Sequence, residues 1–177
     1  MKTLNKSANK SERAFLVAYD SHADALFRHI YFRVHERELA RDLLADTFAR
    51  VWQYIQMGND IENMRAFLYK TAHNLVIDYY RKHKDQSLDA MTESGFDPAD
   101  HSRSNSTYTT AELSQFLKAL DSIPNEYKEV ILMRYIDDLS PEDIAQILDE
   151  NTNTISVRVH RGVAMVRKEL GLTSEGK

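Results

Sequence analysis

Apolar residues recur at helical spacing along most of this chain, and stretches that alternate strictly between apolar and polar residues are essentially absent. The 177 residues include only five Gly and three Pro, so few positions would interrupt a helix. The pattern therefore predicts an all-α fold, in which each helix buries one apolar stripe and exposes the opposite face. Length alone allows either one domain or two small ones.

The N-terminal half is expected to contain four helices. We expect them at residues 12–20, at 22–34 with Ser21 as the cap, at 36–55, and, after a loop at 56–62, at 63–84. The apolar side chains expected to form the core of the first three are Phe15, Tyr19, Leu26, Ile30, Val34, Leu39, Leu43, Leu44, Phe48, Val51, Trp52 and Ile55. The fourth helix should turn Lys70, His73, Asn74, Ile77 and Arg81 away from its apolar stripe.

A segment rich in Ser, Thr, Asp and Asn separates this half from the rest of the chain. Residues 85–110 lose apolar periodicity, which indicates a flexible, acidic linker. Helices are expected again at 111–120, 126–135, 141–148 and 154–170. Ser140 is well placed as an N-cap before Pro141, and Thr152 or Thr154 is expected to cap the last helix.

The last two of these helices are joined by a short turn, as in a helix-turn-helix. Such a turn usually needs one residue at positive φ, and Asp149 or Asn151 is expected to supply it. The last helix should bury an apolar stripe and expose polar and basic residues near its start, which suits a DNA major groove. The alternative is a helical hairpin packed within a bundle, without any DNA contact.

Charge is distributed unevenly along the chain, although its net value is −4. Residues 63–84 carry five basic side chains against one acid, and residues 151–168 carry four against none, so each segment has a charge of +4. Residues 85–126 hold eight acids against two bases, a charge of −6. Because local charge determines where phosphate can dock, the two basic helices are candidate DNA-binding surfaces. Ordinary solvated helix faces are the alternative interpretation.

Several function classes fit the sequence poorly. Without cysteine the chain has no disulfides, thiolate metal sites or cysteine nucleophiles. There is no HExxH motif, glycine-rich phosphate loop or G-x-S-x-G motif, so we expect neither an enzyme nor a cofactor or catalytic metal. The N-terminal residues lack a continuous apolar run and no later segment approaches a membrane span, so we expect a cytoplasmic protein without membrane insertion.

Three segments, in their order and spacing, resemble one family. They are ELARDLLADTFARVW at 38–52, RAFLYKTAHNLVIDYYRKHK at 65–84, and the run from LDSIPNEYKEV to VAMVRKEL at 120–170. The chain resembles the extracytoplasmic-function (ECF) sigma factors, small two-domain members of the bacterial sigma-70 superfamily. The resemblance implies a region-two-like domain at 12–84, a linker at 85–110 and a region-four-like helix-turn-helix domain at 111–172.

The resemblance also implies roles for individual residues. The segment at 38–52 would dock on a coiled coil of the RNA polymerase β′ subunit, with the two acids on the exposed side. The residues at matching positions are Asp42, Leu43, Asp46, Phe48 and Trp52. The segment at 65–84 would bind and melt the minus-ten promoter element, with residues 57–65 as the specificity loop beside it. Asn74 would line the pocket for an extruded base, and the basic residues assigned to DNA there are Lys70, Arg81, Lys82 and Lys84.

The C-terminal helix-turn-helix would then bind the minus-thirty-five element as duplex. Its implied DNA-facing residues are Thr154, Ser156, Val157, Arg158, His160 and Arg161. Further implied partners are the polymerase β flap and an anti-sigma factor that masks the polymerase-binding surfaces. The resemblance thus implies an alternative sigma factor that directs promoter-specific initiation; the rival hypothesis is a helix-turn-helix regulator that binds DNA without core polymerase.

Overall fold

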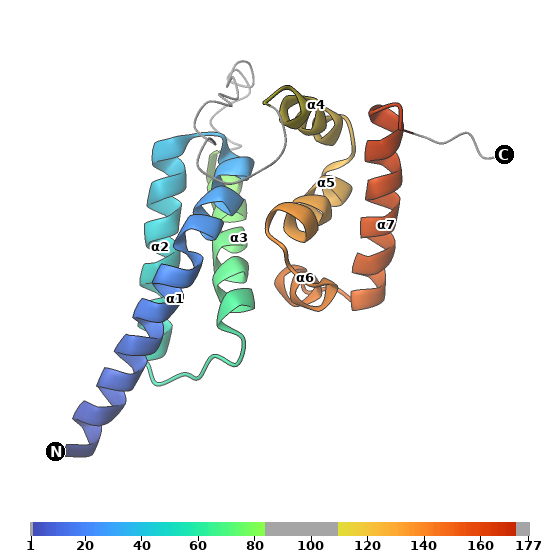
Figure 1. Ribbon diagram of the computed structural model, residues 1–177. Coiled ribbons are helices and arrows are strands. Elements are labelled where there is room, and N and C mark those ends of the chain that lie inside the picture. Colours follow the sequence, from blue (N-terminus) through green and yellow to red (C-terminus); the bar gives the residue numbers. More distant parts are fainter. Residues whose placement is uncertain (1, 84–109, 173–177) are drawn as a thin grey trace. The chain divides into compact units, whose positions relative to one another are not determined.

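Every regular element in the described part of the chain is a helix, which confirms the predicted all-α fold (Figure 1). The computed structural model describes residues 2–83 and 110–172, with side chains described from residue 12 and from residue 114 in the two ranges. The elements are α1 (Lys2–Val34), α2 (Arg37–Gln56), α3 (Met64–His83), α4 (Thr110–Asp121), α5 (Asn125–Ile131), the π-helix η2 (Leu132–Ile136), α6 (Pro141–Leu148) and α7 (Thr152–Glu169). The predicted linker, apart from Thr110, lies outside the described residues.

The helices form two compact units. In the first unit, α1, α2 and α3 all contact one another. In the second, α5 contacts α7, η2 and α4, and α4 also contacts α7. Residues 141–145 of α6, the helix between η2 and α7, also belong to the second unit. Two small helical bodies are therefore present, each with its own buried core.

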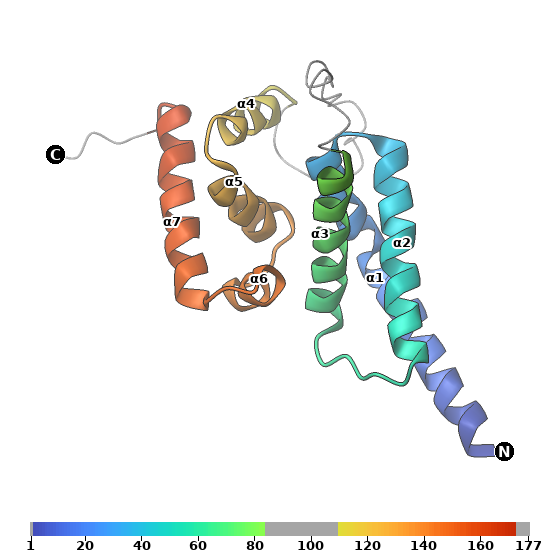
Figure 2. The same cartoon turned by 180° about the vertical axis from the view of Figure 1, so that it is seen from behind.

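The prediction of two helices that meet at Ser21 is wrong, because α1 is one continuous helix through that position. No Gly or Pro interrupts the chain there, and the Asp20 and Ser21 side chains face solvent, where they cost an α-helix little. The apolar positions also keep helical spacing across this point, with Ala18, Leu26 and Ile30 all buried. Figures 1 and 2 show the first turns of α1 extending beyond α2 and α3.

Aromatic rings fill the contact between α1 and α2. The Phe15 ring lies 4.9 Å from the Trp52 ring and 6.0 Å from the Phe48 ring, centroid to centroid, and the Tyr19 ring lies 4.7 Å from Phe48. Tyr19, predicted to be core, is nevertheless 46% exposed, because it packs at the edge of the contact. Phe48 itself is buried, so its main role in the isolated chain is to hold α2 against α1.

The helix α3 is buried over a wider arc than one stripe. Leu68, Ala72, Leu75 and Val76 are buried, but so is His73, which was expected on the outer face. The difference arises because both α1 and α2 pack on α3. Two neighbouring helices cover more of a helix surface than one does.

The second unit depends on a close approach of α5 and α7. Gly162 of α7 is buried, and a Cβ atom placed on it would lie 3.0 Å from Ile131 Cγ1 and 3.4 Å from Tyr127 Cβ. Around this contact a cluster of buried side chains joins α4, α5, η2 and α7: Ala119, Leu120, Ile123, Ile131, Leu132 and Val166. The absence of a side chain at Gly162 therefore lets α7 settle into the core.

The helix expected at 126–135 is α-helical in its first part and π-helical in its second. Its first part is α5, and its second part is η2, where the Asp137 amide donates to the Leu132 carbonyl at 3.1 Å, five residues back. Asp138 follows at φ 51°, and Leu139 is buried. The wider π-helical turn ends the helix and directs the chain into α6. There Ser140 is the N-cap, as predicted, and completes a capping box with Asp143.

We predict that Gly162→Ala destabilises the second unit. The added methyl group improves helix propensity by about 1 kcal/mol, but overpacking against a buried Ile131 costs about 1–3 kcal/mol, so the free energy of unfolding should fall by up to about 2 kcal/mol. Denaturant unfolding of the full chain, followed by circular dichroism, measures the change. Adding Ile131→Val, which removes the Cδ1 atom 3.3 Å from the new Cβ, should make the double variant lose less than the two single variants together. A variant more stable than the parent chain would contradict the prediction.

Candidate nucleic-acid interface

The turn between α6 and α7 has the geometry expected of a helix-turn-helix. Asp149 ends α6 at φ 54°, so it is Asp149, of the two candidates, that supplies the left-handed conformation. The Glu150 amide donates to the Ala145 carbonyl at 2.9 Å and closes the end of α6. The prediction that Thr152 or Thr154 caps α7 is wrong. The cap is Asn151, whose side-chain oxygen accepts from the Asn153 amide at 2.8 Å, so both threonines lie inside the helix.

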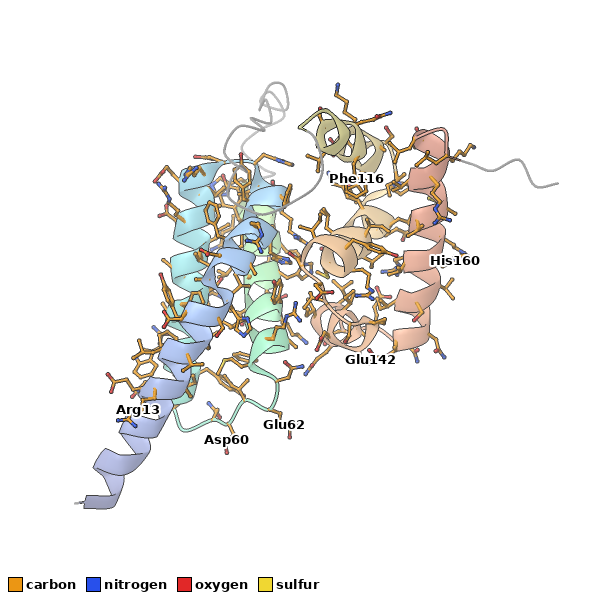
Figure 3. All side chains as sticks on the ribbon, viewed as in Figure 1. Arg13, Asp60, Glu62, Phe116, Glu142 and His160 are labelled. Atoms are coloured by element: carbon orange, nitrogen blue, oxygen red, sulfur yellow. The ribbon has the colours of Figure 1, made fainter. Side chains whose placement is uncertain are left out.

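The first turns of α7 expose most of the residues predicted to face DNA. Ile155, Gly162 and Val166 are buried against the unit, so the opposite side of the helix is in solvent. On that side Thr154, Ser156, Val157, His160 and Arg161 are exposed, with Val157 49% exposed. Figure 3 labels His160 on α7. A polar face with a basic residue, at the start of a helix that follows a tight turn, is a surface that fits a major groove.

Arg158 differs from its neighbours on this helix because its guanidinium already binds a carboxylate of the same unit. Its Nη1 and Nη2 atoms donate to the two carboxylate oxygens of Glu150, each at 2.9 Å. The Arg158 side chain is only 20% exposed. Glu150 was not predicted as a site residue, since the pair joins residues eight positions apart across the helix-turn boundary. Only the folded turn brings them together.

The outer face of α3 carries the second set of predicted DNA-binding residues. Asn74, Arg81 and Lys82 are exposed and Lys70 is half-buried, whereas Lys84 lies outside the described residues. Arg81 Nη2 lies 2.9 Å from Asp78 Oδ1 in an exposed ion pair, which leaves the guanidinium accessible. From Asn74 onward the face is thus open to solvent and basic at its end, and it also exposes the apolar side chain of Ile77.

The last turns of α3 are held in place by Tyr80. Its hydroxyl donates to the Arg33 carbonyl, at the end of α1, at 2.6 Å. Burial, and then the neighbouring Tyr79, raise the pKa of Tyr80, so the hydroxyl keeps its proton and remains a donor. The Tyr79 ring stacks on His83, with centroids 4.2 Å apart.

A loop joins the end of α2 to the start of α3, within the residues predicted as the specificity loop. Gly58 takes a φ of 84°, Asn59 Nδ2 donates to the Tyr54 carbonyl at 3.1 Å, and Asn63 Oδ1 accepts from the Ala66 amide at 3.0 Å. Asp60 and Glu62 are exposed in this loop (Figure 3). The loop is therefore anchored at both ends, with its acidic side chains pointing into solvent.

At the N-terminal end of α3, Arg65 affects His22 of α1. Burial is the main cause that lowers the pKa of His22, and the charge of Arg65 lowers it further. His22 is consequently less charged at neutral pH than a free histidine, and Arg65 supplies most of the positive charge at this end of α3.

The exposed face of α2 carries the predicted polymerase-binding acids. Asp42 and Asp46 are both exposed and lie four residues apart, so they project from the same side of the helix. Leu43 and Phe48, predicted as part of the same site, are only 7% and 4% exposed. Their side chains therefore support α2 from within and do not form its accessible surface.

Two family models match this chain. The model of sigma-70 region 2 matches residues 18–86, and that of sigma-70 region 4 matches residues 113–166. The ECF RNA polymerase sigma factor SigW of Bacillus subtilis is 30% identical over 175 residues, which cover 93% of this chain and 94% of SigW. The chain belongs to the ECF sigma factors. Its function is that of an alternative sigma factor, which directs transcription initiation.

Other relatives agree with this assignment. The RNA polymerase sigma factor SigV of Bacillus subtilis is 25% identical over 93% of this chain and 96% of its own length. Among solved structures, the sigma factor RpoE of Bartonella quintana, in complex with the anti-sigma factor NepR, has a TM-score of 0.70 at 23% identity, covering 92% of this chain and 98% of RpoE. CnrH, in complex with the cytosolic domain of CnrY, has a TM-score of 0.68 at 20% identity, covering 96% of both chains. These two structures share the fold of this ECF sigma factor.

The family consists of transcription initiation factors and not of enzymes. Within residues 12–83 and 114–172, whose side chains are described, no three His, Asp or Glu side chains come together as a possible metal site. In the same part of the chain, no helix combines the length and the apolar character that crossing a membrane requires.

Proposed function

We propose that this ECF sigma factor binds core RNA polymerase through α2, holds the melted minus-ten strand on α3, and binds the minus-thirty-five duplex with α7. One observation carries the proposal: in a chain with a net charge of −4, each unit exposes one basic helix face. The corresponding domains are residues 12–84 and 111–172, with residues 85–110 as the linker. We propose no catalytic site, and a cytoplasmic location, where RNA polymerase works.

The face of α3 suits single-stranded DNA. The Asn74 amide can pair with the edge of a base that has left the stack, and Arg81, Lys82 and Lys84 can hold backbone phosphates. Lys70, one turn before Asn74, would extend this contact. Tyr80 supports the assignment because it fixes the helix turn that carries Arg81 and Lys82. The anchored loop at 57–63 would supply further base contacts beside Asn74.

The face of α7 suits duplex DNA. The first turn of a helix that follows a tight turn can enter a major groove, where Arg161 reaches either a guanine edge or a phosphate. Thr154, Ser156, Val157, Arg158 and His160 would complete this contact. Val157 is 49% exposed, which leaves an apolar group for contact with a thymine methyl.

The α2 face suits a basic protein surface. Asp42 and Asp46 present two carboxylates on one exposed side, and the buried Leu43 and Phe48 keep the helix from shifting. We propose the β′ coiled coil as the partner of this face and the β flap as a second polymerase contact. RpoE was solved in complex with the anti-sigma factor NepR, and we propose that an anti-sigma factor likewise covers the polymerase-binding surfaces of this chain.

Reconstitution with core RNA polymerase tests the proposal against a regulator that acts without polymerase. The full chain is mixed with core enzyme and genomic DNA of the organism that encodes it, and transcript 5′ ends are sequenced. We expect a stable complex with core and initiation at a shared promoter sequence. Binding to duplex DNA without any core complex or sigma-dependent transcript would favour the rival regulator.

Reversing the charge of the α2 acids should weaken the core complex. Asp42→Lys with Asp46→Lys places like charges against a basic partner, and we expect a loss of about tenfold or more in affinity for core. Fluorescence anisotropy of the labelled chain measures this affinity. The matched control is Asp20→Lys with Asp24→Lys, which makes the same reversal at two exposed positions of α1. Equal losses in both double variants would assign the effect to net charge and not to α2.

Truncating Arg161 should weaken promoter use. If the guanidinium contacts a base, Arg161→Ala should cost about 1–3 kcal/mol of promoter binding by holoenzyme. Arg167→Ala removes the same charge from the same helix about 9 Å further along, and it should have a much smaller effect. Promoter binding by the two holoenzymes, compared at one salt concentration, gives the result. Equal effects, or none, would remove Arg161 from the site.

A further inference from the structure

The ion pair between Glu150 and Arg158 lies at the start of the helix proposed to bind duplex DNA. Both carboxylate oxygens of Glu150 accept from Arg158, at 2.9 Å each, in the parallel two-bond geometry that is the strongest form of such a pair. The side chains are 32% and 20% exposed, so solvent screens the pair less than a fully exposed one. Arg161, three residues later, forms no ion pair within the described residues.

We propose that Glu150 limits the electrostatic attraction of α7 for DNA by holding and neutralising Arg158, and so acts as a specificity-determining residue. The inference rests on the proposed duplex-binding role of α7. A basic side chain strengthens binding to any DNA sequence because it displaces counterions from phosphate. A neutral pair provides no such gain.

Glu150 and a DNA phosphate compete for the same N–H groups of the Arg158 guanidinium. Two of its five N–H groups are committed to Glu150. A phosphate that takes their place leaves the Glu150 carboxylate without its partner, and a phosphate that joins the pair meets the carboxylate's negative charge. Either route weakens phosphate binding at Arg158 equally for all sequences. Base-edge contacts from the other residues of α7, such as Arg161, are not affected, so Glu150 raises the ratio of specific to non-specific binding.

The test compares the salt dependence of DNA binding in full-length variants. The probe is a fluorescein-labelled duplex of mixed sequence, about 30 base pairs long, titrated from about 50 to 200 mM KCl. Glu150→Gln should bind more tightly than the parent chain, and the slope of log affinity against log salt should steepen by about 0.9, one phosphate contact. Its advantage should therefore shrink about 3.5-fold across this salt range.

Two further variants assign the effect to Arg158. Adding Arg158→Gln to Glu150→Gln should restore the parent slope, because the charge released by the first change is removed by the second. Arg158→Gln alone should bind more weakly than the parent chain, because the Glu150 charge is left uncompensated. The matched control is Glu169→Gln, which removes the same charge from the far end of α7. At about 16 Å from residue 158, it lies beyond the Debye length of about 10 Å at 0.1 M salt and should leave the slope nearly unchanged.

The outcomes separate this inference from the proposed function. Equal affinity and slope for Glu150→Gln and the parent chain, including no binding by either, would overturn the role of Glu150. Weaker binding by Glu150→Gln, with helicity intact by circular dichroism, would make the pair a structural clamp and would also overturn it. Failure of the proposed function is measured independently, as the absence of a core complex and of sigma-dependent transcripts with the unaltered chain.

Discussion

The packing of α7 against α5 determines which side chains of α7 can reach another molecule. Gly162 lets the two helices approach until Ile131 fills the space where a side chain would stand. With Ile155, Gly162 and Val166 fixed inward, Arg161 and Val157 are fixed outward, because they lie on the same rigid helix. The surface chemistry of this unit is thus decided by a contact in its core.

Much of the fold was accessible from the sequence because helical spacing is a strong signal in a chain with few Gly and Pro. The N-cap at Ser140 and a left-handed residue at Asp149 or Asn151 were also predicted from local chemistry; the structure adds the capping box and selects Asp149. The join expected at Ser21 failed because a residue that favours a cap does not have to form one inside a long apolar periodicity. His73 was misplaced because its burial depends on two helices packing on α3, and a single-helix pattern carries no such information.

Among the site residues, too, the sequence predicted some features and missed others. Exposed positions such as Asp42, Asp46 and Asn74 follow from helix periodicity, and the structure agrees with their exposure. Arg158 was correctly placed on α7, but the carboxylate that binds it comes from the preceding turn. Residues eight positions apart in one helix are separated by about 12 Å, too far for an ion pair, so only the turn geometry reveals this one. The net charge of a basic helix face therefore cannot be obtained by counting its basic residues alone.

The hydrogen bond from Tyr80 to the Arg33 carbonyl has a consequence for how the end of α3 binds a ligand. The last turn of a helix normally frays, and a ligand that contacts it must first bring it to order, which lowers affinity. Here the end of α3 is tied to the end of α1 before any ligand arrives. The backbone turn that carries Arg81 and Lys82 is consequently preorganised, which lowers the entropy cost of the phosphate contact proposed for them.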